Sequence, residues 1–286
     1  MTRLQWADLP GEARAQIEAR FGPADGAVSA GPGLTPGVAA HLTTERGIFL
    51  KGIPLRSPAR HHYERELAVN TVLPGGVPAP RLLWSGRAAG WLLLVFERIL
   101  DARQADLSPE SPDVDAVLDA VTCLGEVLAA CPWPDAPGVD EKFDVMRRRA
   151  QAELGGRYAE ALYALDLREF GGSALLHADL HEGNLLVTHH GRVHVVDWSL
   201  ACRGPAWMDL ALLVPRLIAA GHTPAQAEAL AATVPAWRAA PPAAVTALAA
   251  ARAGFAAHMA RHGPGHLRAR RGRPAAACRA WLAYRT

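Results

Sequence analysis

The chain has 286 residues, of which half are apolar and a fifth are charged, so it is long enough for one large domain or two lobes with their own cores. No apolar run approaches the roughly 20 residues that span a membrane, and the N-terminus lacks the charged-then-apolar order of a signal peptide. The formal net charge is only +2. These features argue against a membrane protein.

The basic residues are unevenly distributed. Of 30 basic residues only Lys51 and Lys142 are lysines, and the rest are arginines. From residue 211 to the end there are ten arginines and one acidic residue, Glu228. The four cysteines are scattered without the C-x-x-C spacing of a zinc site, so we expect a cytoplasmic protein with reduced thiols.

The first hundred residues predict a small antiparallel sheet with two helices. Short apolar runs separated by Gly, Pro and polar turns indicate strands, and longer stretches with apolar residues on one helical face indicate helices. Lys51 lies near the end of the third predicted strand. We expect helices over 9–21 and 59–73, and strands over 26–30, 38–43, 47–53, 81–85 and 91–96.

The remainder of the chain predicts helices almost throughout. We expect helices over 113–130 and 144–169, the second broken near Gly155-Gly156, and only helices beyond residue 205. The only strands expected here are a hairpin of 185–188 and 193–196. The chain is therefore predicted to be an α+β protein with a sheet-rich N-lobe, residues 1–98, and a mostly helical C-lobe, residues 99–286.

One motif carries the chemistry. The segment from His177 to Asn184 has the spacing H-x-D-x-x-x-x-N, and Asp197 follows thirteen residues after Asn184. Phosphoryl-transfer sites use this pattern, because one carboxylate must accept the proton of the attacking hydroxyl while an amide and a second carboxylate hold Mg²⁺. We predict Asp179 as the catalytic base, and Asn184 and Asp197 as the Mg²⁺ ligands.

These motifs resemble those of the aminoglycoside phosphotransferase family, small-molecule kinases with a two-lobed, protein-kinase-like fold. His177–Asn184 is similar to the family's H-G-D-L-H-x-x-N loop, with Ala178 in place of the usual Gly, and 195–198 to its metal-binding I-D-W segment. The resemblance implies ATP and Mg²⁺ as cofactors and a γ-phosphoryl transfer to an alcohol group. Asp209 lies in a segment similar to the family's G-x-P-x-x-D-L-A and is expected to brace the catalytic loop or cap a helix.

The nucleotide site is expected in the N-lobe. Residues 47–51 resemble the family's lysine strand, so Lys51 is expected to contact the α- and β-phosphates and to pair with a glutamate on the next helix. Glu64 and Glu66 both qualify, and the resemblance favours Glu66; they point some 200° apart on a helix, so only one can serve.

Two backbone segments complete the expected nucleotide site. Gly31, Gly33 and Gly37 form a loop whose N–H groups would cover the phosphates, although the spacing departs from G-x-G-x-x-G and an ordinary turn is an equal alternative. The adenine-binding hinge is expected within 96–100, at Glu97 and Ile99.

The acceptor is expected to be a small-molecule hydroxyl compound that is not strongly cationic, because the arginine-rich C-terminal helices would repel a polycation. Acidic residues within 101–169 could line the cleft. The alternatives are a nucleotide-binding pseudokinase acting as an interaction module, an aminoglycoside kinase or a protein kinase. A nucleic-acid binder using residues 268–273 is not expected, because no aromatic residues are interleaved. ATP against GTP, the acceptor and the oligomeric state stay open.

Overall fold

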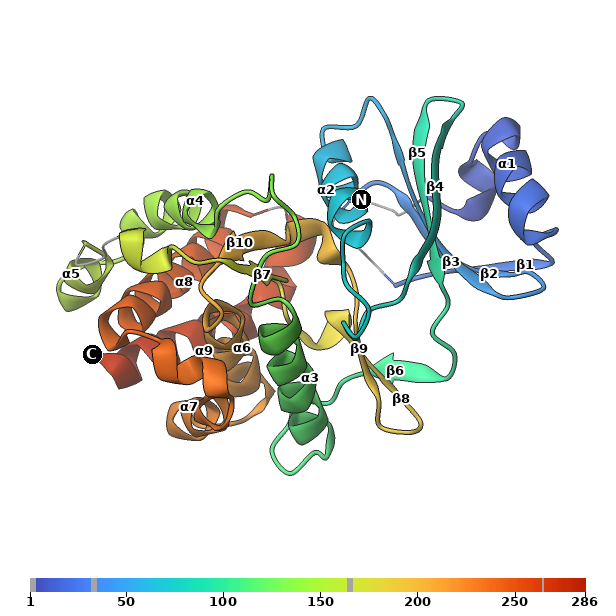
Figure 1. Ribbon diagram of the computed structural model, residues 1–286. Coiled ribbons are helices and arrows are strands. Elements are labelled where there is room, and N and C mark those ends of the chain that lie inside the picture. Colours follow the sequence, from blue (N-terminus) through green and yellow to red (C-terminus); the bar gives the residue numbers. More distant parts are fainter. Residues whose placement is uncertain (1–3, 32–34, 164–166, 264) are drawn as a thin grey trace. The chain divides into compact units, whose positions relative to one another are not determined.

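The chain forms two compact units (Figure 1) in a computed structural model that describes residues 4–31, 35–163, 167–263 and 265–286. The first unit comprises described residues of 1–73, 79–102 and 196–200, and the second comprises 74–78, 103–195 and 201–286. Residues 74–78 thus belong to the second unit although their sequence neighbours belong to the first, and residues 196–200 belong to the first unit although their neighbours belong to the second. The prediction of a single lobe boundary at 98/99 did not include these two segments, because five residues are too few to have a distinct composition.

The first unit is built on a five-stranded antiparallel sheet. Each predicted strand is present, with ends within three residues of those expected, because the apolar runs and turn residues coincide with the strand ends. The order across the sheet is β1-β2-β3-β5-β4. The strands are β1 (Gly26–Ser29), β2 (Val38–Thr43), β3 (Ile48–Pro54), β4 (Leu82–Ala88) and β5 (Trp91–Glu97).

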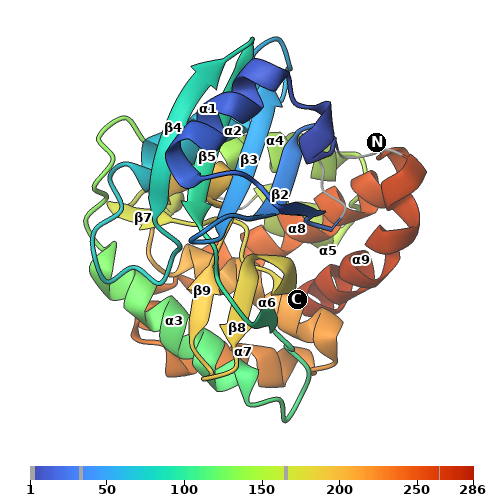
Figure 2. The same cartoon turned by 90° about the vertical axis from the view of Figure 1, so that its right-hand side faces the viewer.

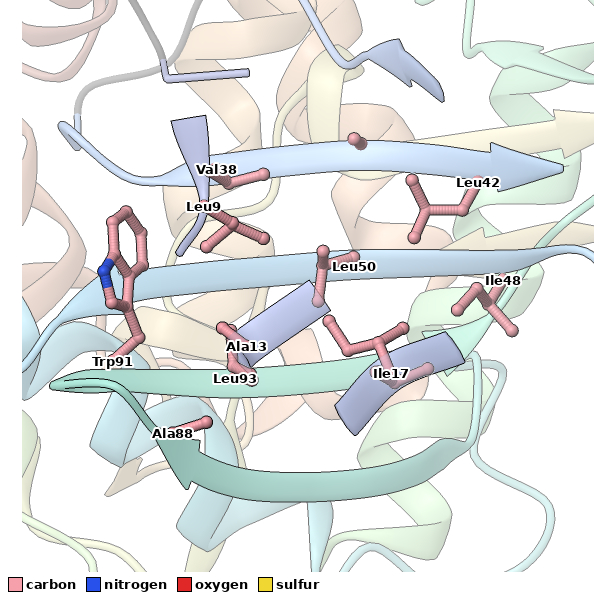
Figure 3. Close-up of a cluster of buried hydrophobic side chains, with 12 residues drawn as sticks. Leu9, Ala13, Ile17, Val38, Leu42, Ile48, Leu50, Ala88, Trp91 and Leu93 are labelled. Atoms are coloured by element: carbon pink, nitrogen blue, oxygen red, sulfur yellow. The ribbon is translucent and has the colours of Figure 1, made fainter. Parts of the chain in front are cut away.

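Each face of this sheet carries a separate hydrophobic cluster, because side chains alternate along a strand. On one face Ile48, Leu50 and Leu93 pack with Ile17 of α1 (Gly11–Phe21), as Figure 3 shows. On the other face a second cluster includes Ile53, Leu92 and Leu94 from the sheet and Tyr63 from α2 (Arg60–Asn70). Lys51 lies between Leu50 and Gly52 in β3, so its side chain points to the α2 face.

The second unit consists mainly of helices, as predicted. Residues 144–169, predicted as one or two helices, contain most of α4 and all of α5. Helix α4 begins five residues earlier than expected, after Gly138, whose extended backbone precedes the first turn. The helices are α3 (Asp113–Val127), α4 (Val139–Gln151), α5 (Arg157–Tyr163), α6 (Met208–Ala220), α7 (Pro224–Thr233), α8 (Pro242–His262) and α9 (Gly265–Arg285).

The prediction that the C-lobe holds only two strands was wrong. The hairpin of β8 (Leu185–Thr188) and β9 (Val193–Val195) is present, with α3 beside it (Figure 2), but β6 (Ala102–Gln104) extends it to three strands. In addition, β7 (Ala174–Leu176) pairs with β10 (Cys202–Gly204). These strands have three residues each, which is too short for an alternating pattern, and their partners are distant in the sequence.

Helix α8 is long and apolar enough to cross a membrane by length and composition alone, which the sequence analysis did not anticipate. Its alanines produce this result, although Arg252 lies in the middle of the helix. Half of its most apolar window is buried, and the helix packs against α4 and α9. That environment is typical of the core helix of a folded unit.

Candidate functional site

Lys51 is the centre of the candidate site in the first unit. Its ammonium Nζ forms an ion pair with Glu66 Oε2 of α2 and donates a hydrogen bond to Asp197 Oδ1 at 3.1 Å. The side chain of Glu66 is 3% exposed, whereas that of Asp197 is 46% exposed, so Glu66 is the buried anchor and Asp197 remains accessible. Of the two glutamates predicted as partners, Glu66 therefore pairs with Lys51, and Glu64 pairs instead with Arg60 at 3.1 Å.

The two carboxylates keep Lys51 charged. Burial by itself would lower the pKa of the Lys51 ammonium, but the charges of Asp197 and Glu66 outweigh burial and hold that pKa above its ordinary value. A compact, permanently charged ammonium on the sheet surface is suited to bind phosphate oxygens.

The segment that carries Asp197 is held against α2. The backbone N–H of Trp198 donates to the Glu66 carboxylate, and the backbone of Ser199 accepts a hydrogen bond from His62. Asp197 itself has a φ of +63°, in the left-handed region that non-glycine residues rarely adopt. These contacts hold a strained residue at one fixed place, which is common for functional residues.

The predicted glycine loop divides into residues with different environments. A Cβ on Gly37 would lie 2.3 Å from Tyr63 Oη and 2.4 Å from the carbonyl oxygen of Gly52, so this position requires glycine for close packing. Gly31 is exposed, and a Cβ there would meet no atom within 4 Å. Gly33 lies outside the described residues. Close packing against Tyr63 and Gly52 is therefore sufficient to explain why residue 37 is a glycine, independently of any ligand of the loop.

The two predicted hinge residues differ in the backbone groups that they leave free. The Glu97 N–H at the end of β5 donates to the carbonyl oxygen of Arg81 at 2.9 Å, so it is already used within the sheet. Ile99 follows the strand and makes no hydrogen bond with any residue that the structure describes. Ile99 is thus the better placed of the two to contact a base through its backbone.

In the second unit, Asp209 at the start of α6 braces the loop that carries Asp179. Its carboxylate accepts the backbone N–H of His177 at 2.8 Å and of Ala178 at 2.7 Å. Burial raises the pKa of Asp209, against the opposing charge of His177 and these two hydrogen bonds. Because the donors sit on consecutive residues, one buried side chain fixes the backbone directly before Asp179.

Lys142 of α4 also holds this loop, although the sequence had not indicated a role for it. Its Nζ donates to the carbonyl oxygen of Ala178 at 2.6 Å. Ala178 has a φ of +61°, which costs an alanine about 1–2 kcal/mol relative to glycine, so its peptide groups need such anchors. The rarity of lysine in this chain was the signal that could have identified Lys142.

The other two loop residues are positioned by local hydrogen bonds. The Asn184 side-chain Nδ2 donates to the carbonyl oxygen of Asp179 at 3.0 Å, which leaves the amide oxygen of Asn184 as a possible metal ligand. His181 Nδ1 accepts the Gly183 N–H at 3.0 Å and begins the short 3-10 helix Glu182–Asn184. Burial lowers the pKa of His181 against the opposing charge of Asp179, so the ring is neutral at pH 7 and can accept that bond.

A cavity of about 450 Å³ lies beside this loop within the second unit. Its charged lining residues are Asp106, Glu182, Arg216 and Arg273, which come from four separate parts of the chain. Arg216 makes no hydrogen bond or ion pair with any described residue. Sequence reasoning had considered Asp106 among several acidic residues, but it had no local pattern by which to find the two arginines.

The family of the chain follows from a match over most of its length. Residues 38–244 match the model of the family described as "Phosphotransferase enzyme family", and this range contains Lys51, Glu66, the loop with Asp179, and Asp197. A comparison with the curated proteins found no match.

Solved structures with the same fold include three phosphotransferases. The complex of APH(2″)-IIia with GDP and kanamycin has a TM-score of 0.63 at 15% identity, covering 95% of this chain and 97% of that one. Choline kinase LicA from Streptococcus pneumoniae has a TM-score of 0.62 at 15% identity, covering 95% and 98%. Aminoglycoside phosphotransferase APH(4)-Ia with ADP and hygromycin B has a TM-score of 0.57 at 17% identity, covering 93% and 98%. These likenesses confirm the predicted kinase-like fold.

The two glutamates of α2 allow a direct test of the Lys51 pair. Removing one partner of a buried ion pair costs about 3–5 kcal/mol, so we expect Glu66→Gln to lower the free energy of unfolding markedly and to weaken nucleotide binding. Glu64→Gln, which breaks only surface pairs with Arg60 and Arg87, should change the unfolding free energy by less than about 1 kcal/mol. Denaturant unfolding and calorimetric titration of an ATP analogue measure both effects. Equal losses in the two variants would contradict the assignment of Glu66.

The lowered pKa of His181 predicts a pH dependence. Such a histidine stabilises the fold above its unfolded pKa of about 6.5, and the stabilisation is lost as the pH falls through the lower folded pKa. His181→Asn keeps a side-chain acceptor for the Gly183 N–H but does not titrate. Its unfolding free energy should therefore fall less steeply than that of the wild type between about pH 7 and pH 5, in urea denaturation. The control His190→Asn, in an exposed turn, should show the same pH dependence of the unfolding free energy as the wild type. If His181→Asn also showed the wild-type pH dependence, the pKa shift assigned to His181 would be refuted.

Proposed function

Because the chain belongs to the phosphotransferase enzyme family, we propose that it transfers the γ-phosphoryl group of ATP to a hydroxyl group of a small molecule. The observation that carries this proposal is the Lys51 ammonium held between Glu66 and Asp197. In kinases such a lysine–glutamate pair orients the phosphates, and catalysis rests on positioning and electrostatic stabilisation. Asp179 would then accept the proton of the attacking hydroxyl, which is worth roughly 10²–10⁴ in rate.

The residues present fit a Mg²⁺ ion. Mg²⁺ prefers oxygen ligands and uses one or two from the protein, with phosphate oxygens and water completing the octahedron. The Asn184 nitrogen donates to the carbonyl oxygen of Asp179, and its amide oxygen has no hydrogen bond to any residue within the described part of the chain. The Asp197 carboxylate is 46% exposed. Each of these side chains offers an oxygen of the kind that the ion prefers, and a bound ion would neutralise the charge of the phosphates.

The charges of the second unit support an acceptor that is neutral or anionic rather than polycationic. Asp113, one of the acidic residues considered for the cleft, is buried and engaged by both terminal nitrogens of Arg103. Asp106 lines the cavity, but its Oδ1 already accepts the Ser108 N–H at 2.9 Å. The cation Arg216, in contrast, lines the cavity and donates no hydrogen bond to a residue that the structure describes. Glu182 also lines the cavity, but Arg216 and Arg273 balance the two acidic residues, so a polycationic aminoglycoside would meet no excess of negative charge here.

The test is turnover of Mg-ATP with a panel of neutral, anionic and cationic hydroxyl compounds, followed as ADP formation. We expect turnover with a neutral or anionic acceptor, and we expect Asp179→Asn to lower kcat by roughly 10²–10⁴ without weakening the binding of an ATP analogue. The exposed Glu141→Gln serves as the control and should retain wild-type kcat.

Three results would count against parts of this proposal. Nucleotide binding without turnover of any acceptor would favour a pseudokinase. Turnover of aminoglycosides alone would overturn the acceptor class, and phosphorylation of protein substrates alone would favour a protein kinase. Unchanged kcat in Asp179→Asn would remove Asp179 from the mechanism.

A further inference from the structure

Three side chains that could ligate a metal ion converge on the surface of the second unit, outside the catalytic loop. His258 and His262 lie one turn apart on α8, so both project from the same face of the helix. Glu153 follows the end of α4. Its Oε1 lies 3.5 Å from His258 Nδ1 and 3.5 Å from His262 Nε2. One ligand atom from each of the three residues lies within 4.8 Å of those of the other two.

The polar atoms of this cluster are incompletely satisfied. The Glu153 side chain is 2% exposed, and its other oxygen, Oε2, pairs with Arg261 Nη1 at 2.5 Å. His258 Nδ1 is buried and has no hydrogen-bond partner among the residues that the structure describes. A buried ring nitrogen without a partner therefore faces a carboxylate oxygen, which is costly unless a cation or a proton lies between them.

We propose that Glu153, His258 and His262 bind one divalent transition-metal ion, with Zn²⁺ as the best fit. Tetrahedral Zn²⁺ with bonds of about 2.0–2.1 Å holds its ligand atoms roughly 3.3–3.4 Å apart, close to the two distances of 3.5 Å. Imidazole nitrogen suits zinc, copper or nickel, whereas Mg²⁺ prefers an all-oxygen set. The site is therefore chemically distinct from the one proposed for Mg²⁺.

The surroundings suit such an ion. Arg261 holds the second oxygen of Glu153, and ligating carboxylates are commonly hydrogen-bonded in this way. The His262 side chain is 61% exposed, so a fourth position is open to water. Since the ligands come from α8 and from the chain after α4, the ion links two helices that pack together. It would stabilise the second unit according to its affinity and concentration.

The test uses the full chain, treated with EDTA and dialysed, and titrated with ZnCl₂ in a calorimeter. We expect one Zn²⁺ per chain and a rise in Tm on binding. His262→Ala should lower the affinity by more than the roughly tenfold that loss of an outer-shell partner costs. Glu153→Gln, which keeps the shape of the side chain, should lower it similarly. Bound Co²⁺ should show the visible absorption of a tetrahedral site.

Controls distinguish this site from other histidines and from misfolding. The double variant His189→Ala, His190→Ala removes two exposed neighbouring histidines and should bind Zn²⁺ like the wild type. Circular dichroism establishes that each variant is folded. Absence of Zn²⁺ binding to the folded wild type would overturn the proposal and indicate ion pairs of protonated histidines with Glu153. Binding that survives in both His262→Ala and Glu153→Gln would overturn it as well.

Discussion

The buried ammonium of Lys51 between two carboxylates is the interaction on which the first unit depends. An ammonium removed from water loses several kcal/mol of solvation, and this loss is offset only by well-placed partners. The partners come from α2 and from the segment of residues 196–200, far apart in the sequence. These contacts therefore determine together which face of the sheet Lys51 of β3 points to, how α2 is rotated about its axis, and where Asp197 lies.

Each of the two lysines of the chain places a compact ammonium where the planar guanidinium of an arginine would be a poorer match. Lys51 contacts two carboxylates, and Lys142 donates to a single carbonyl oxygen beside the proposed base. Each site accommodates a compact point charge, whereas a planar guanidinium spreads five donors over a rigid fork. In a chain that uses arginine for nearly every other cation, both lysines lie next to predicted functional residues. The bias toward arginine says nothing about the role of any one arginine, but it draws attention to the two positions where lysine is kept.

The loop with Asp179 shows how a strained backbone is maintained. Ala178 adopts a left-handed conformation, and its N–H and C=O groups are held by Asp209 and Lys142, respectively. The two charged side chains come from α6 and α4. Strain of this kind persists only where surrounding structure determines it, so these helices contribute to the site without supplying a reacting group.

The sequence predicts the features that depend on local order. Short apolar runs bounded by turn residues predict β2, β3 and β5, because a sheet that packs on both faces has strands that are apolar almost throughout. Helical geometry separates Glu64 from Glu66, although which of them pairs with Lys51 depends on the rotation of α2. Three features could not be predicted, because they arise from contacts between residues far apart in the sequence. They are the pairing of the three-residue β7 and β10, the inclusion of residues 196–200 in the first unit, and the cavity lined by Arg216. No local pattern encodes residues brought together only by the fold.

The most direct test of the role given to Lys51 is the affinity of Lys51→Arg for a non-hydrolysable ATP analogue with Mg²⁺, measured by titration calorimetry. The charge is conserved, but a planar fork of five donors replaces the compact ammonium between Glu66 and Asp197. We expect the affinity to fall at least about tenfold, which corresponds to about 1.4 kcal/mol, while circular dichroism shows a folded protein. An affinity equal to that of the wild type would contradict the assignment of Lys51 as a phosphate-binding residue that must be a compact ammonium.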